Sequence, residues 1–172
     1  MKQTSLMHLL LAFLAGFTFF VVDAHHATAG LPPVERVVVY KSRHIMQLLS
    51  GNEVVRSYKV ALGRNPLGTK QRAGDCRTPE GSYVIDWHKK NSKFYKSLHI
   101  SYPNNQDLAT SKNRGSSPGG DIMIHGLPKG FEELADDHYL RNWTKGCIAV
   151  NNTEMDEIWK LVADETPILI KP

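Results

Sequence analysis

Cysteine is scarce in this chain, which has two among its 172 residues, Cys76 and Cys147. Neither belongs to a C-x-x-C pair, and no H-x-x-x-H pair supplies further ligands, so the sequence argues against a zinc site. The chain also lacks internal repeats, low-complexity linkers and basic stretches interleaved with aromatic residues. We therefore expect no metal, no cofactor and no nucleic-acid partner, and we predict a single folded domain that is a monomer.

The first 29 residues differ in composition from the rest of the chain. Lys2 precedes an apolar stretch of 14 residues from Leu9 to Val22, and small residues follow it. A charged start, an apolar middle and an A-x-A site at 27–29 are typical of a secretory signal peptide. An uncleaved membrane anchor is the alternative, although the stretch is short for a bilayer. We predict a signal peptide at 1–29, a domain at 30–172 and export to the periplasm or cell envelope.

Short apolar and β-branched runs separated by turn residues predict a mainly β domain with a few helices, of the α+β class. Three extended segments, 34–40, 44–49 and 53–62, are joined by short turns and predict a β-meander. Further strands are predicted at 82–87, 98–102, 122–125, 148–150 and 166–170. The inward-facing candidates of the meander are Val37, Val39, Leu48, Val54 and Val60.

Helical patterns are predicted in three places. A polar helix covers 104–114, and a second covers 131–140 because Phe131 and Leu134 fall on one side. The third has Thr153 as its N-cap and an apolar stripe from Met155 to Val162, which fits core packing better than a ligand groove. Between the strands, the loop 63–81 is rich in Gly, Pro and charge and is long for a compact domain, which favours a functional loop over a plain surface excursion.

Two reactive side chains stand at the ends of short apolar runs. His125 ends the run 122–125, and Cys147 follows Gly146 and opens the run 148–150. If these runs are neighbouring strands, the imidazole lies beside the sulfur, favours the thiolate and later protonates a leaving amine. The residues alone leave two alternatives open: a buried structural pair, or a disulfide between Cys76 and Cys147 that would silence the nucleophile.

Three sequence motifs, together with the predicted hairpins at the start of the domain, resemble those of a known family. They are Gly74-Asp75…Thr78-Pro79-Glu80-Gly81, His125-Gly126 and Gly146-Cys147-Ile148. Together they resemble the catalytic domain of the L,D-transpeptidases of bacterial cell walls, the YkuD type, over about residues 34–171. The resemblance implies a single-domain β-sandwich or barrel. It also implies a cysteine acyltransferase that forms a thioester with tetrapeptide stems of peptidoglycan, for wall cross-linking or for attachment of a lipoprotein.

The resemblance implies roles for individual residues. Cys147 would be the acyl-accepting nucleophile and His125 the general base, oriented by the backbone carbonyl of Gly126. The N–H groups of Gly146 and Cys147 would form the oxyanion hole, and such donors commonly contribute ~3 kcal/mol to the transition state.

Four further residues are predicted to face the substrate: Thr144, Lys145, Asp75 and Arg77. Lys145 could raise the local positive potential or could be a solvated lysine at a strand end. Asp75 and Arg77 could instead hold the long loop in shape.

The sequence departs from the family pattern in two ways. Lys145 and Ala149 stand where the family usually has His and Arg, and His125 and Cys147 are separated by 22 positions, so that the segment 127–142 could form a lid. The variant motif Trp-Thr-x-Gly-Cys-Ile-Ala-Val resembles a subgroup containing both transferases and hydrolases. An L,D-carboxypeptidase, an endopeptidase or a lipoprotein-detaching hydrolase is therefore an alternative, and a non-catalytic wall-binding domain is an alternative of another class.

Overall fold

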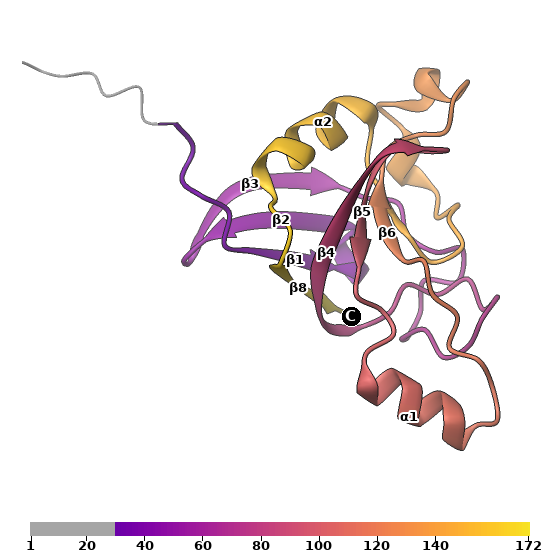
Figure 1. Ribbon diagram of the computed structural model, residues 1–172. Coiled ribbons are helices and arrows are strands. Elements are labelled where there is room, and N and C mark those ends of the chain that lie inside the picture. Colours follow the sequence, from indigo (N-terminus) through magenta and orange to yellow (C-terminus); the bar gives the residue numbers. More distant parts are fainter. Residues whose placement is uncertain (1–29) are drawn as a thin grey trace, which may run out of the picture. The chain divides into compact units, whose positions relative to one another are not determined.

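The computed structural model describes residues 30–172, and the predicted signal peptide lies outside the described residues. Eight strands form one sheet in the order β3-β2-β1-β8-β4-β5-β6-β7. Their bounds are β1 (Arg36–Tyr40), β2 (Ile45–Ser50), β3 (Glu53–Lys59), β4 (Gly81–Ser92), β5 (Tyr95–Ile100), β6 (Met123–His125), β7 (Ile148–Ala149) and β8 (Thr166–Lys171). The prediction of a mainly β domain with a few helices is confirmed (Figure 1).

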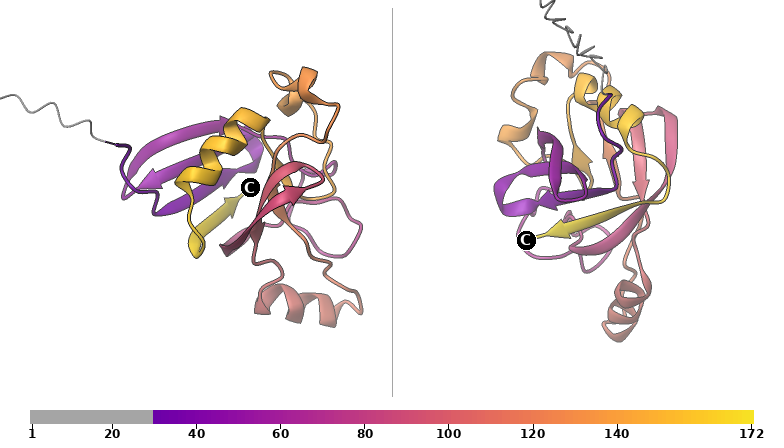
Figure 2. Two further views of the ribbon diagram at one scale, coloured as in Figure 1. Left: turned by 45° about the horizontal axis from the view of Figure 1, so that its top comes forward. Right: turned by 90° about the vertical axis from the view of Figure 1, so that its left-hand side faces the viewer.

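The sheet curls into a half-barrel, because the chain beyond one edge strand returns to the other edge. After β3, Ala61 forms an antiparallel bridge with Ala149 of β7, and Gly63 forms a parallel bridge with Thr144. Two further pairings are parallel, β1 with β8 and β6 with β7, and the remaining strand pairs are antiparallel. Figure 2 shows this curvature from two more sides. The curl brings the loop that follows β3 to the edge where β6 and β7 end.

Side chains that point into the curl form the core. Val37, Val39, Leu48 and Val60 are buried as predicted. The prediction for Val54 is wrong, since that side chain is 50% exposed. A β-bulge shifts the register of β2 against β3 between Leu48 and Leu49, and such a shift reverses which face the following residues occupy.

Two α-helices are present in the described residues, α1 (Asn105–Asn113) and α2 (Asn152–Leu161). The predicted cap of α2 is wrong by two residues: Asn151 accepts from the N–H of Glu154, and Glu154 completes a capping box. The apolar stripe of α2 packs in the core, with Met155 and Ile158 buried. In Figure 1, α2 lies beside the curled sheet, whereas α1 projects away from it. No helix within 30–172 is both long and apolar enough to cross a bilayer.

The predicted helix at 131–140 is wrong. The segment instead contains two separate 3₁₀ turns, η2 (Glu132–Leu134) and η3 (His138–Leu140); a third, η1 (Lys41–Arg43), follows β1. The apolar residues Phe131 and Leu134 are half exposed, at 51% and 50%. Without a packed apolar face, a short segment gains too little from helix formation to offset its nucleation.

Candidate active site

The parallel pairing of β6 with β7 sets the relation between His125 and Cys147. Ile124 lies opposite Ile148, and His125 lies opposite Ala149. Cys147, one residue before β7, therefore falls opposite Met123, two positions from His125. Residues two apart on a strand share a face, so the imidazole and the thiol lie on the same face of this strand pair. The other face carries Ile124 and Ile148 into the core.

The imidazole of His125 is held on several sides. Its Nδ1 lies 2.7 Å from the carbonyl oxygen of Gly126. Because a carbonyl only accepts, Nδ1 carries the proton and the lone pair of the neutral ring is on Nε2. The ring stacks on Phe94 with centroids 4.5 Å apart and meets Trp143 edge-on at 5.6 Å. Burial lowers the pKa of His125 to about 4, against the opposing effect of the Gly126 hydrogen bond.

Glycine is required at position 126 because the chain passes close to α2. A Cβ there would lie 2.5 Å from Oδ1 of Asn152, an atom that accepts a hydrogen bond from the N–H of Leu127. The first turn of α2 thus fixes the carbonyl that orients His125. This contact supplies the geometry that the predicted role of Gly126 requires.

The thiol of Cys147 donates to the carbonyl oxygen of Asp121, with a sulfur–oxygen distance of 3.5 Å. Burial raises the pKa of this thiol, and Asp121 raises it further, although the backbone of Met123 and the charge of Lys70 act in the opposite direction. No hydrogen bond joins Cys147 to His125 within the described residues. Cys76 and Cys147 are both free, so the alternative of a disulfide between them does not hold in this structure.

The turn that leads into the nucleophile is built around Thr144. Its hydroxyl accepts from the N–H of Gly146 at 3.1 Å and donates to the carbonyl of Cys147 at 2.8 Å. Gly146 has φ +132°, and a Cβ there would lie 2.7 Å from the carbonyl oxygen of Arg77. Only glycine combines this backbone conformation with such a close approach.

This turn differs from the expectation in two respects. Thr144 is buried and holds the turn together, so its hydroxyl is not free for a substrate. The N–H of Gly146 is bound to that hydroxyl and is likewise not a free oxyanion donor. The N–H of Cys147, in contrast, has no acceptor among the hydrogen bonds of residues 30–172. It is therefore the amide that remains free to meet a developing negative charge.

His125 and Cys147 open into one cavity of about 1060 Å³. The segment 127–142 forms one of its walls through Leu127, Phe131, Leu134 and Leu140, and Trp143 follows directly. Lys145 is exposed and also lines this cavity. A large apolar space beside a buried imidazole and a thiol can hold an extended substrate while limiting water at the reacting atoms.

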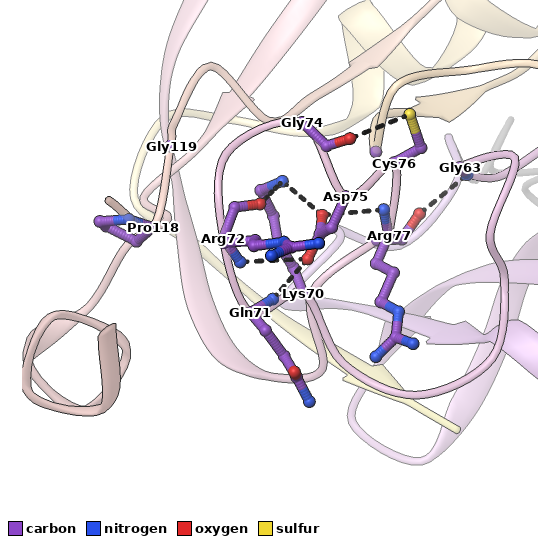
Figure 3. A network of polar contacts seen from close by, with 12 residues as sticks. Gly63, Lys70, Gln71, Arg72, Gly74, Asp75, Cys76, Arg77, Pro118 and Gly119 are labelled. Atoms are coloured by element: carbon purple, nitrogen blue, oxygen red, sulfur yellow. Dashed lines mark hydrogen bonds and ion pairs between the residues drawn. The ribbon is translucent and has the colours of Figure 1, made fainter. Parts of the chain in front are cut away.

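The long loop 63–81 is fixed from inside by buried charged groups. Both oxygens of Asp75 accept hydrogen bonds, from Lys70 Nζ at 2.9 Å and from the N–H groups of Gln71, Arg72 and Arg77 at 2.7, 3.1 and 3.1 Å. Figure 3 shows the carboxylate turned toward the backbone of its own loop. Asp75 therefore shapes the loop, and the expectation that it faces the substrate is not met.

Arg77 contributes to the site in a different way from the expected one. Its carbonyl oxygen packs against Gly146, whereas its side chain lines a second cavity formed by the loop. The ammonium of Lys41, buried nearby, donates to the carbonyls of Gly68 and Thr78 and pairs with Glu80 at 2.7 Å. The loop is thus a rigid support for the turn before Cys147.

Sequence reasoning missed two residues beside the reactive pair. Phe94, at the tip of the β4–β5 hairpin, stacks on His125, and nothing in the sequence indicates a contact over that separation. Asp121, which accepts from the thiol, adopts φ +52°. The preceding pair Gly119-Gly120 is the one available signal, because paired glycines favour an unusual backbone path.

Comparison with known proteins gives the family. The sequence model of YkuD, the L,D-transpeptidase catalytic domain, matches residues 34–170. The chain belongs to the YkuD family of L,D-transpeptidase catalytic domains. Over 112 residues it is 32% identical to YafK of Escherichia coli K12, whose name classes it with the L,D-transpeptidases; this covers 64% of the chain and 38% of YafK. The chain thus spans about two fifths of that relative.

Solved structures share the YkuD-family fold. Pgp2, the helical cell shape determining protein of Campylobacter jejuni, superposes with a TM-score of 0.63 and 24% identity, over 81% of this chain and 48% of Pgp2. Bd1075 of Bdellovibrio bacteriovorus gives a TM-score of 0.55 and 21% identity, over 82% of this chain and 51% of Bd1075. At these identities the likeness concerns the fold, and the expected L,D-transpeptidase architecture is confirmed.

Proposed function

We propose that this YkuD-family domain is a cysteine acyltransferase that acts on tetrapeptide stems of peptidoglycan. The observation that carries the proposal is the shared face of β6 and β7, which places the thiol of Cys147 and the oriented imidazole of His125 in one cavity. The family supports the L,D-stereochemistry of the bond that is attacked. The nucleophile and base together supply what acyl transfer requires.

The resting pair is neutral. The pKa of His125 is lowered to about 4 and that of the Cys147 thiol is raised, both chiefly by burial, so a preformed thiolate–imidazolium pair is not favoured. The thiol must first turn from the carbonyl of Asp121 toward Nε2 of His125. Catalytic hydrogen bonds commonly tighten only when substrate is bound. Proton transfer then accompanies attack of the sulfur rather than preceding it.

Each half of the reaction uses the same two side chains. Sulfur attacks the carbonyl carbon between the L-centre and D-alanine, and its proton passes to Nε2 of His125. The N–H of Cys147 faces the oxyanion, and the imidazolium protonates the leaving amine, which releases D-alanine and leaves a thioester. An incoming amine then gives a proton to His125 as it attacks, and the thiol recovers that proton on leaving. The acceptor amine belongs to a second stem or to a lipoprotein lysine.

The place of action is part of the same proposal. A cleaved leader at 1–29 would deliver the domain to the periplasm or cell envelope, where peptidoglycan lies. The similarity to Pgp2, a helical cell shape determining protein, supports a role in wall architecture and cell shape. We propose that the protein acts as a monomer, since both reactive side chains come from one chain.

Mass analysis of muropeptides tests this function. Isolated cell-wall sacculi are incubated with the full chain, with Cys147→Ala, and with Cys76→Ala as a matched control that removes the other thiol. New cross-linked dimers with wild type and Cys76→Ala, absent with Cys147→Ala, are the expected result. Loss of D-alanine, broken cross-links or freed lipoprotein without new dimers would assign a hydrolase to the same thiol. Identical profiles for wild type and Cys147→Ala would contradict catalysis and favour a wall-binding domain.

A further inference from the structure

A second cavity, of about 480 Å³, lies between the long loop and the end of α1. Three arginines line it: Arg72 and Arg77 come from the loop, and Arg114 is the C-cap of α1. Its other lining residues are mostly polar, and they include Gln71 and Ser116. Three guanidinium groups around one cavity create a strongly positive local potential, which an anionic ligand would relieve.

The charges of these arginines are not neutralised by the protein. One carboxylate, that of Asp75, lines the cavity, and both of its oxygens already accept hydrogen bonds from Lys70 and from backbone N–H groups of the loop. Within residues 30–172 the three guanidinium groups make no hydrogen bond and no ion pair with a side chain. Nε of Arg77 is buried and has no partner. Figure 3 shows the Arg77 side chain extending away from Asp75.

A third depression, of about 430 Å³, shares lining residues with both the arginine cavity and the active-site cavity. Gly74 lines both this depression and the arginine cavity, and Gly120 and Lys145 line both this depression and the cavity of Cys147. Arg64 and Lys145 add positive charge to its wall, whereas the charge of Lys70 is paired with Asp75. These adjoining depressions, with Lys145 and Arg64 between the cavity of Cys147 and the three arginines, form a basic path along the loop.

We propose that Arg72, Arg77 and Arg114 bind free carboxylates of the peptidoglycan stem whose carbonyl is attacked by Cys147. This inference rests on the proposed function, because the stem must continue beyond the bond that is broken and the basic path offers it a course. The planar fork of a guanidinium matches a carboxylate with two parallel hydrogen bonds. The site would make the enzyme specific for stems with free, rather than amidated, acidic residues.

Binding to the full chain carrying Cys147→Ala tests the site without turnover. The probes are a synthetic tetrapeptide stem with free carboxylates and the same peptide with those carboxylates converted to amides, measured by calorimetry. We expect the free acid to bind at least about ten-fold more tightly, as one lost charge-assisted contact suggests. Adding Arg72→Gln and Arg114→Gln should abolish that preference. Both side chains are exposed, and a thermal melt checks that the fold is kept.

The control pair Lys89→Gln and Lys90→Gln removes the same charge from exposed positions of β4 and should leave the preference intact. The proposal would be overturned if both pairs lost the preference for the free acid equally, or if the arginine pair kept it. The proposal would also be overturned if the arginine pair weakened the binding of inorganic polyphosphate but did not change the binding of the stem. Arginine-dependent stem binding without release of D-alanine by wild type would refute the proposed function alone. Turnover with a KM unchanged in the arginine pair would refute this site alone.

Discussion

Replacing Asp75 by asparagine tests whether one carboxylate holds the loop that supports the nucleophile. Burial by itself would raise the pKa of Asp75, but hydrogen bonds from Gln71 N–H, the Lys70 ammonium and two further N–H groups outweigh it and lower the pKa to about 2 from 3.8. A difference of this size corresponds to about 2 kcal/mol. Because the folded pKa is depressed, this stabilisation is complete well above pH 3.8 and is lost as the pH falls through 2.

The full cost of Asp75→Asn exceeds that figure. The amide group that replaces one oxygen meets backbone N–H donors, and the Lys70 ammonium, whose side chain is 4% exposed, loses its counterion. We expect a loss of about 2–4 kcal/mol at pH 7 and a fall in Tm of roughly 5–15 °C. The carboxylate's own contribution should decline to about half at pH 3.

Thermal and urea unfolding at pH 7 and pH 3 measure these effects. Asp136→Asn, which changes an exposed carboxylate of the segment 127–142, is the matched control and should leave Tm unchanged within about 1 °C. If Asp75→Asn had the same Tm as the control at pH 7, the carboxylate would not be the group that fixes the loop. A destabilisation that did not decline at pH 3 would contradict the pKa argument.

Three further perturbations address the reactive pair. Gly146→Ala should destabilise the protein by about 2–4 kcal/mol, because the new Cβ would clash with the backbone of Arg77 and strain its own φ. Gly130 also has a positive φ but has open space around it, so Gly130→Ala should cost much less, and thermal melts of both variants measure the difference. Phe94→Ala should expose the imidazole and raise the pKa of His125 from about 4 toward 6.5, as followed by NMR titration, and an unchanged pKa would show that stacking is not what buries it. Alkylation of Cys147 by iodoacetamide, read by peptide mass, should be slower at pH 7 than that of glutathione and should rise steeply above pH 9, because burial raises the thiol pKa; fast alkylation at pH 7 would indicate a preformed thiolate.

The strands and the nearness of His125 and Cys147 could be predicted because their signals are local. Apolar runs bounded by glycine mark β6 and β7, and two short strands with reactive ends place His125 and Cys147 close together once the strands pair. The resemblance to the family motifs further restricted the set of folds to consider. What such signals cannot report is the partner of a hydrogen bond: the hydroxyl of Thr144 takes the Gly146 N–H, so the predicted donor is already used.

The errors have physical causes that lie outside the local sequence. The bulge in β2–β3 turned Val54 to solvent, and no residue pattern marks it. The apolar residues at 131–140 follow a helical spacing, yet they line a cavity instead of packing on a sheet, and the segment forms 3₁₀ turns. For Asp75 the sequence left two roles open, facing the substrate or holding the loop in shape, and four donors from its own loop support the second.

The central claim is that Cys147 forms a thioester with a peptidoglycan stem with the help of His125. The most direct measurement is the intact mass of the full chain after brief incubation with a synthetic tetrapeptide stem. The account predicts a mass increase equal to the stem without its D-alanine, removed by hydroxylamine, present in Cys76→Ala and absent in Cys147→Ala and His125→Ala. An adduct that survives in Cys147→Ala, or D-alanine release with no dependence on either residue, would contradict the account.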